Sequence, residues 1–217
     1  MKKNFFKNCF AILLLFVCAS SYAQGNEIDL SETDIKDIQK QAALKVWQFG
    51  EYIATIADTR NSRSARIKDC RRTLNLFIEK GEGYWEEGEW KNGVFIEVTS
   101  VTRKTNYPKM LKTYLFGLAN LNYPRVYIET TNVNMIEVGA LRHIAGNKYE
   151  CTAYFEQAFT ATTEDGKYKY GDITRKSVKC YVFVETVEVI KPGDSPLEFT
   201  IKLGDVKALE TKPLRRK

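Results

Sequence analysis

The sequence predicts an α+β domain in which three helices, all in the N-terminal half, pack on a curved, long-stranded antiparallel sheet. Apolar residues recur every three or four positions between residues 35 and 78, and the period changes to two from Arg125 onward. Two long β-rich runs then flank Asp165-Gly166, a strong hairpin signal. Helices and strands that occupy separate parts of a chain are typical of the α+β class.

Three segments carry the helical spacing. The first helix is predicted to start at residues 31–34, where a side-chain oxygen can cap free N–H groups, and its stripe is Ile35, Ile38, Ala42, Val46, Phe49, Ile53 and Ile56. The second, shorter helix follows the polar segment 58–64 and buries Ile67, Cys70, Leu74, Phe77 and Ile78. The third opens at Tyr107-Pro108, with proline at its first position, and buries Leu111, Leu115 and Leu118.

The strands are expected in the ranges 94–101, 125–130, 132–144, 149–159, 176–189 and 199–203. A two-residue type I′ turn at Asp165-Gly166 pairs residue 164 with 167 and places Cys151 opposite Cys180, close enough for a disulfide. Gly171 leaves another outcome open, because a glycine inside a strand often marks a bulge that would send Cys180 to the opposite face. Two reduced core cysteines are then expected.

Residues 1–23 are typical of a secretory signal peptide, which predicts a periplasmic or secreted protein. A basic start and a short apolar core at 10–17 precede Ser21-Tyr22-Ala23, which suits signal cleavage. A lipoprotein anchored through Cys18 is the alternative, which the bulky Phe16 and Val17 before it disfavour. Residues 24–210 are expected to form a single domain, and residues 211–217 a short basic tail.

Composition and motifs exclude several function classes. The net charge is +6, but Lys2, Lys3 and Lys7 of the signal account for three of these charges, and the remaining +3 gives nucleic-acid binding no support. No second apolar run approaches the ~20 residues of a transmembrane helix. His143 is the single histidine, so no metal site is expected. The sequence has no glycine-rich phosphate loop, so no cofactor is expected.

Two pairs of residues are candidates for ligand binding. Tyr154 and Glu156 share one face of a predicted strand; they would converge on a ligand if that face turned inward, and the alternative is a solvent-facing surface. Trp85 and Trp90 lie in an aromatic, acidic and glycine-rich loop that could stack on a sugar or a peptide, or could cap the helices as a small core. We expect one tryptophan to be packed and the other exposed.

The order of elements between Ile35 and Leu203 resembles the nuclear transport factor 2-like superfamily, and looks most like its exported bacterial members. The segments that carry the resemblance are 76–78, 96–101, 153–157 and 172–176. It implies a cystatin-like architecture, in which a curved sheet wraps round helices to form a cone with a pocket inside. Such pockets host enzymes, binders and docking modules alike, so the resemblance implies a shape and leaves the chemistry open.

The sequence therefore favours a non-catalytic binding or docking module for an unknown small ligand or periplasmic protein partner, with a homodimer through the sheet left open. The alternative is a small pocket enzyme of the isomerase or hydrolase kind that uses Glu156 and Tyr154. An enzyme of that kind needs a desolvated acid inside the pocket. A pocket lined only by apolar side chains would exclude it.

Overall fold

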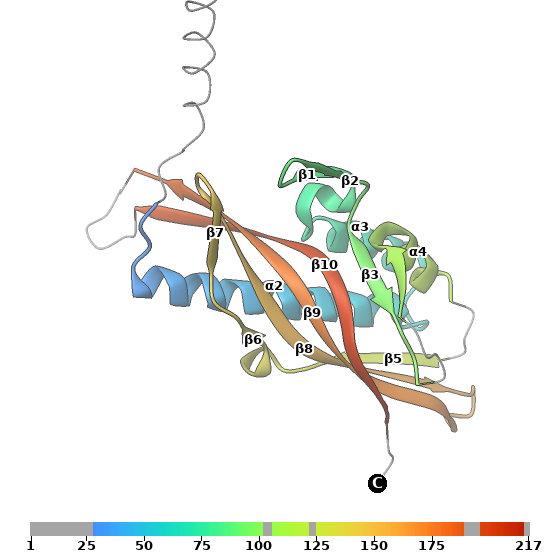
Figure 1. Cartoon of the computed structure of the whole chain (residues 1–217). Helices are drawn as coiled ribbons and strands as arrows, with labels where there is room; N and C mark the ends of the chain where they lie inside the picture. The colour runs from blue at the N-terminus through green and yellow to red at the C-terminus, as the bar shows by residue number, and fades with distance from the viewer. Residues whose placement is uncertain (1–27, 102–105, 122–124, 189–195, 215–217) are drawn as a thin grey trace, which may run out of the picture.

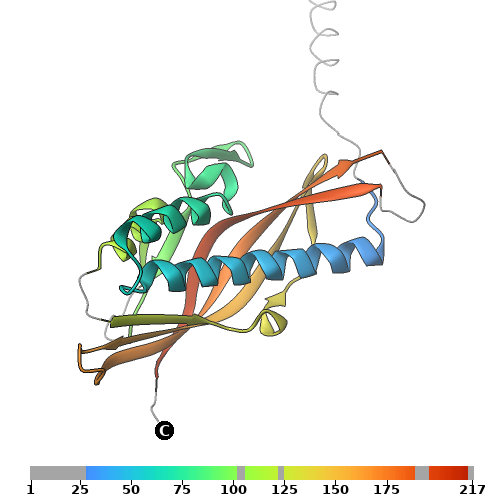
Figure 2. The same cartoon turned by 180° about the vertical axis from the view of Figure 1, so that it is seen from behind.

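The computed structural model describes residues 28–101, 106–121, 125–188 and 196–214. The predicted signal peptide, with the alternative lipidation site at Cys18, lies outside these residues. One long helix, α2 (Glu32–Ala57), lies along one face of a curved sheet, and α3 (Arg63–Leu74) and α4 (Leu111–Ala119) lie beside its C-terminal half (Figure 1). The view from behind shows the three helices in front of the sheet (Figure 2). The α+β class is confirmed.

The capping and the apolar stripe predicted for α2 are both present. Ser31 and Asp34 form a capping box, in which the Asp34 N–H donates to Ser31 Oγ at 3.2 Å and the Ser31 N–H donates to Asp34 Oδ2 at 3.0 Å. The stripe residues from Ile38 to Ile56 are buried. At Gly50 a Cβ atom would lie 2.3 Å from the Thr130 hydroxyl, so glycine is what allows the helix to approach the sheet this closely.

The second helix is shorter than predicted, and it ends at Leu74. Leu76 and Phe77 are buried beyond the helix, where the Leu76 carbonyl accepts a hydrogen bond of 2.9 Å from the Leu203 N–H of the sheet. A short 3-10 turn, η2 (Ile78–Gly81), follows. The apolar residues after Leu74 therefore serve strand contacts, which helical spacing alone could not distinguish from another helical turn.

The prediction that Tyr107-Pro108 opens the third helix is wrong. Residues Tyr107–Met110 form the strand β4, which pairs antiparallel with β3 (Phe95–Val98), and α4 begins at Leu111. Pro108 has no N–H to donate, and β4 tolerates it because β4 is the edge strand of the sheet. The burial of Leu111, Leu115 and Leu118 is confirmed.

The main sheet is mostly antiparallel and runs in the order β4-β3-β10-β9-β8-β5. Its long strands are β8 (Lys148–Thr162), β9 (Tyr168–Thr186) and β10 (Leu197–Pro213), and β5 (Arg125–Thr130) forms the other edge. The short strands β6 (Glu137–Val138) and β7 (Arg142–Ala145) also pair with β8, and η3 (Val133–Met135) lies between β5 and β6. The pairing of β10 with β3 is parallel. The last strand, β10, is therefore longer than the predicted range of 199–203.

The β8–β9 hairpin reaches the predicted register by an unpredicted route. The turn is a three-residue loop between Thr163 and Lys167 with Gly166 at φ +79°, rather than the two-residue type I′ turn. That loop shifts the pairing by one residue, and a β-bulge at Lys169, opposite Thr162 and Ala161, shifts it back. The two shifts cancel. Cys151 therefore pairs with Cys180, as predicted.

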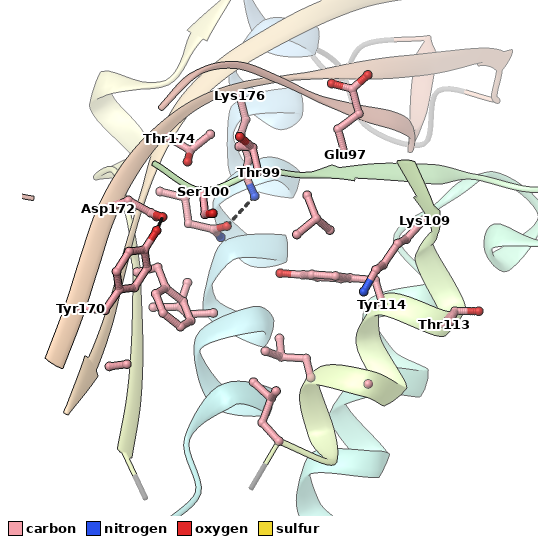
Figure 3. A pocket seen from close by; sticks show the side chains of 18 of the residues that line it. Glu97, Thr99, Ser100, Lys109, Thr113, Tyr114, Tyr170, Asp172, Thr174 and Lys176 are labelled. Atoms are coloured by element: carbon pink, nitrogen blue, oxygen red, sulfur yellow. Dashed lines mark hydrogen bonds between the residues drawn. The ribbon is translucent and has the colours of Figure 1, made fainter. Parts of the chain in front are cut away.

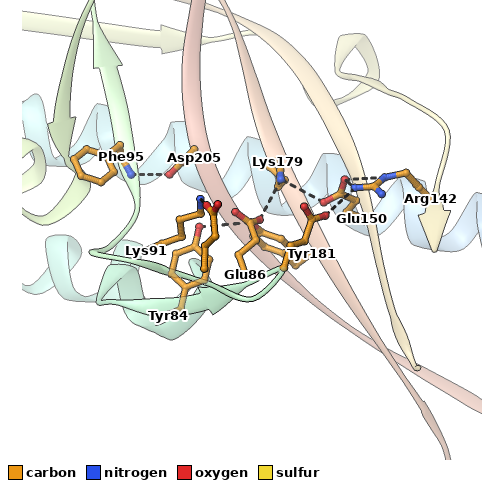
Figure 4. A network of polar contacts seen from close by, with 11 residues as sticks. Tyr84, Glu86, Lys91, Phe95, Arg142, Glu150, Lys179, Tyr181 and Asp205 are labelled. Carbon is orange, nitrogen blue, oxygen red and sulfur yellow. Dashed lines mark hydrogen bonds and ion pairs between the residues drawn. The ribbon is translucent and has the colours of Figure 1, made fainter. Parts of the chain in front are cut away.

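A separate two-stranded ribbon, β1 (Tyr84–Glu86) and β2 (Glu89–Lys91), confirms the predicted short β excursion before the first main strand. Figure 4 shows it lying over the face of the sheet opposite α2. Within the described ranges, no helix is both long and apolar enough to cross a membrane.

Candidate functional site

A pocket of about 600 Å³ opens between α4 and the part of the sheet formed by β3, β5, β8 and β9 (Figure 3). Its apolar wall comes from Val98, Leu118, Leu121, Ile128, Phe159 and Ala161. The helix α2 contributes none of the lining residues, so the pocket occupies the space beside α2 under the curve of the sheet. A concave, largely apolar pocket of this size with a few polar groups is the usual form of a small-molecule site.

The polar side of the pocket is built largely by one strand. Tyr170, Asp172, Thr174 and Lys176 of β9 all line it, because alternate residues of a strand point to the same face. Asp172, Thr174 and Lys176 are buried. Gln157, also buried, faces the same space from β8. A polar row inside a largely apolar pocket therefore follows directly from the alternation of β9.

Lys176 is the most perturbed charged group of this row. Its side chain is buried, and burial lowers the pKa of its ammonium to about 8, against a smaller opposing effect of Asp172. Its Nζ donates one hydrogen bond of 2.7 Å to Gln157 Oε1. An ammonium carries three donors. Across the described residues no second acceptor is bonded to Nζ, so two donors remain for a molecule in the pocket.

Asp172 and Tyr170 form a second pair at the same wall. The Tyr170 hydroxyl donates a hydrogen bond to Asp172 Oδ2 (Figure 3). Burial raises the pKa of the Asp172 carboxyl, although the Tyr170 hydrogen bond and the Lys176 charge act in the opposite direction. Burial also raises the pKa of Tyr170. The pocket thus contains a desolvated acid.

Tyr114 faces this row from the opposite side. It extends from α4 across the pocket toward β9, with its hydroxyl at the inner end (Figure 3). Burial raises the pKa of Tyr114 to about 12, so the phenol stays protonated at neutral pH and can donate a hydrogen bond. Among the residues that the structure describes, none is hydrogen-bonded to it. Tyr114 and Lys176 therefore present two hydrogen-bond donors to the same pocket.

The sequence-predicted pair Tyr154 and Glu156 does not line this pocket. Both residues belong to the face of β8 opposite the one that carries Gln157, and Glu156 is exposed. There the Arg175 guanidinium lies 5.7 Å from the centre of the Tyr154 ring. The row of polar residues that does face the pocket lies on β9, and the signal for it in the sequence is the alternation of polar residues from Tyr170 to Lys176. Those residues were not recognised as a site.

The expectation that one tryptophan of the loop is packed and the other exposed is wrong. Trp85 is 67% exposed and Trp90 is 54% exposed, and their rings contact edge to face with centroids 5.6 Å apart. They lie opposite each other in the β1–β2 ribbon. The ribbon is too short to bury either ring, so the pair forms an exposed aromatic surface away from the pocket.

A network of charges attaches this ribbon to the outer face of the sheet (Figure 4). Lys179 Nζ lies 3.1 Å from Glu86 Oε1 and 3.4 Å from Glu150 Oε2, and Tyr181 also donates a hydrogen bond to Glu86. Desolvation would raise the pKa of Glu86, but the hydrogen bonds from Tyr181 and Lys179 outweigh it and lower that pKa. Arg142 pairs with Glu150 on the same face. This cluster is internally paired and fixes the ribbon.

The remaining candidates are structural in their placement. Cys151 and Cys180 are buried directly opposite each other in the β8–β9 ladder, and Cys70 is buried on α3. His143 is half-buried, with Nε2 2.9 Å from the Gly146 carbonyl. No cluster of three or more His, Cys, Asp or Glu side chains suited to a metal ion occurs among the described residues.

No family profile and no curated protein matches the sequence. One solved structure that does match is the crystal structure of a protein provisionally described as a scytalone dehydratase from Novosphingobium aromaticivorans. It is 9% identical, with 85% of this chain and 93% of that chain covered, at a TM-score of 0.42. It is at most a distant likeness in fold.

Proposed function

We propose that the chain is a small-molecule-binding module of the nuclear transport factor 2-like kind, and that its pocket takes a ligand with an apolar body and an acceptor oxygen. The observation that carries the proposal is the pair of donors, Tyr114 Oη and Lys176 Nζ, that face one largely apolar pocket with capacity for another acceptor. A hydrogen bond from one of these donors to a ligand oxygen is worth about 0.5–1.5 kcal/mol, net of the hydrogen bond to water that it replaces.

The shape and charge of the pocket restrict the ligand further. Phe159, Leu118 and Ile128 favour an aromatic or aliphatic body. A carbonyl or carboxylate oxygen would accept hydrogen bonds from Lys176 and Tyr114, whereas Asp172, on the same strand as Lys176, disfavours a negative charge close to its own carboxylate. Glu97 and Lys109 line the pocket from β3 and β4. The ligand class is therefore a small apolar acid, aldehyde or ketone.

A small pocket enzyme stays the second candidate, with different residues from those the sequence suggested. Tyr154 and Glu156 lie outside the pocket, but Asp172 and Lys176 lie inside it and their pKa values are shifted toward neutrality. Groups with such shifts are suited to general acid–base catalysis. A pocket lined only by apolar side chains would exclude an enzyme, and this pocket is not lined in that way.

We also propose that the protein acts outside the cytoplasm, after removal of residues 1–23. The support is the basic start, the short apolar core and the small residues at Ser21 and Ala23. The N-terminal residue of protein recovered from the exported fraction tests this. A start at Gln24 is expected. An intact Met1, or a lipidated Cys18, would contradict it.

The binding proposal is tested by thermal unfolding and calorimetry of the full mature chain. The probes are matched aliphatic and aromatic acids, aldehydes and ketones, with the corresponding hydrocarbons as controls. Oxygen-bearing probes are expected to raise the unfolding temperature by mass action, and the hydrocarbons to raise it less. Tyr114→Phe should weaken binding by about 2- to 10-fold, the value of one hydrogen bond.

The control is Lys207→Met, which changes an exposed lysine of β10 outside the pocket. It should bind as the unmodified chain does, whereas Lys176→Met should lose the preference for oxygen-bearing probes. Failure of every probe to bind would overturn the proposal. Equal binding by the Lys176→Met and Lys207→Met variants would also overturn it.

A further inference from the structure

Lys176 differs from the other two lysines that line the pocket. Lys169 is exposed and Lys109 is half-buried, whereas Lys176 is 8% exposed and reaches the interior of the pocket (Figure 3). Gln157 Oε1 accepts one hydrogen from its Nζ at 2.7 Å and so fixes the position of the nitrogen. A primary amine fixed inside a largely apolar pocket is positioned to react with a molecule that the pocket holds.

We propose that Lys176 forms a Schiff base with an aldehyde or ketone ligand of this pocket, an inference that rests on the ligand-binding function proposed above. Two observations support it together. The nitrogen has donors left over once Gln157 is satisfied, and the Tyr114 hydroxyl faces it from α4 across the same space. A carbonyl placed between them would present its carbon to the amine and its oxygen to the phenol.

The environment favours the reactive form of the amine. Only the neutral amine has the lone pair that attacks a carbonyl. Burial destabilises the ammonium and lowers the pKa of Lys176 to about 8, so near neutral pH a far larger share of Lys176 is neutral than of an ordinary lysine. Asp172 partly opposes this effect, because its charge favours the ammonium. The apolar wall supplies the desolvation.

The reaction balances without any further reagent. The Nζ lone pair forms a bond to the carbonyl carbon, the π bond of the carbonyl opens onto its oxygen, and one proton passes from nitrogen to oxygen. The C–O bond of this adduct then breaks as the nitrogen forms the C=N bond and gives up its second proton. One water leaves, and both of its hydrogens come from the amine. Tyr114 assists by donating a hydrogen bond to the carbonyl oxygen.

The roles of the neighbouring side chains follow from their positions. Gln157 is a positioning residue, because it contacts the amine and has no group that reacts. Tyr114 would touch the ligand itself. If Tyr114 polarises the carbonyl, Tyr114→Phe should slow imine formation and leave the identity of the modified lysine unchanged. Gln157→Leu should slow it as well, by releasing the nitrogen from its fixed position.

The experiment traps the imine by reduction. The full mature chain is incubated briefly with hexanal or benzaldehyde and then with cyanoborohydride, which delivers a hydride to the imine carbon and leaves a stable secondary amine. Intact mass and peptide mapping then locate the adduct. The expected result is a dominant single adduct on the peptide that contains Lys176, formed faster than on any exposed lysine, and lost in Lys176→Arg but kept in Lys207→Met.

Peptide mapping of the unmodified chain keeps the test valid if Lys176→Arg does not fold. Adducts spread over the exposed lysines, with Lys176 labelled no faster than they are, would overturn the inference. If the aldehydes and acids bind in the thermal assay but Lys176 is not trapped, the Schiff base is wrong and the binding function stands. If none of them binds and none is trapped, both proposals fail.

Discussion

Cys151 lies directly opposite Cys180 in the antiparallel ladder between β8 and β9, and both side chains are buried. The hydrogen bond with Cys151 and burial raise the pKa of the Cys180 thiol, whereas the same hydrogen bond lowers the pKa of Cys151. Burial raises the pKa of Cys70 to about 11. The Cys180 and Cys70 thiols should therefore resist alkylation in the native protein, since the thiolate is the reactive form.

We expect that any disulfide of the mature chain joins Cys151 to Cys180 and never involves Cys70, which lies on α3. Alkylation under denaturing conditions without reduction, followed by mass analysis, measures this. Three labels indicate no bond. One label, with the peptides of Cys151 and Cys180 linked, indicates the bond that the ladder allows. A linked peptide that contains Cys70 would contradict the register.

Leu115→Ala should lower the free energy of unfolding by about 2–5 kcal/mol, because its side chain is fully buried where α4 packs. Chemical denaturation of the two proteins gives the difference. Leu44→Ala is the matched control, since Leu44 is 44% exposed on α2 and should change the stability far less. Equal effects of the two substitutions would mean that α4 does not pack as described.

The stability of the protein should depend on Lys176 at alkaline pH. Its pKa is about 8 in the folded protein against an ordinary value of 10.5, so between these pH values the unfolded chain binds more protons and stability rises with pH. The gain is on the order of 3 kcal/mol, because each unit of pKa difference is worth about 1.4 kcal/mol. The free energy of unfolding of the unmodified chain should rise between pH 7 and 11, whereas that of Lys176→Met should lack this rise.

The titration of Asp172 does not interfere with this measurement. Its pKa is raised from 3.8, so its contribution to stability is present at low pH and is lost as pH rises through the acid range. That range is separate from the alkaline window of Lys176. If the free energies of unfolding of the two proteins changed in parallel at alkaline pH, the burial of Lys176 would be contradicted. A difference confined to acid pH would have to come from Asp172.

Both tryptophans of the ribbon should be open to a quencher. Trp85→Phe and Trp90→Phe each leave the other ring exposed, so acrylamide should quench the remaining ribbon tryptophan efficiently in both variants. The two rings contact edge to face, and a double-mutant cycle should show a coupling of about 0.5–1.5 kcal/mol. A third tryptophan, Trp47, is common to both samples and does not affect the comparison. Strong protection in either variant would contradict the exposed pair.

Lys179→Met should release the β1–β2 ribbon from the sheet. The substitution removes the cation between Glu86 and Glu150 and leaves two partly buried carboxylates without it. Hydrogen exchange of residues 84–91 should become faster, while the pocket and its ligand binding stay unchanged. Lys207→Met serves as the control. Unchanged exchange of the ribbon would mean that Tyr181 alone holds Glu86 in place.

Much of the fold was determined by short-range pattern. The stripe of α2, the burial of Leu111 and Leu115, and the long β8–β9 hairpin follow from periodicity, because the position of a side chain along a helix or a strand decides its face. The end of α3 and the start of α4 do not follow from it. The spacing of Phe77 suits a helix as well as the strand contact it makes, and Pro108 suits a helix start as well as an edge strand.

Alternation along β8 separated Tyr154 and Glu156 from Cys151 and Phe155, but it could not say which set turns toward the helices, because both faces of the strand carry polar and apolar residues. The tertiary structure decided that Gln157 and the row from Tyr170 to Lys176 face the pocket. It also decided the hairpin register, since the extra residue of the loop and the β-bulge at Lys169 shift the pairing in opposite directions. The sequence by itself thus determined the class of this protein and most of its elements. Only packing decided the site, because burial of Lys176 depends on chain segments distant from it in sequence.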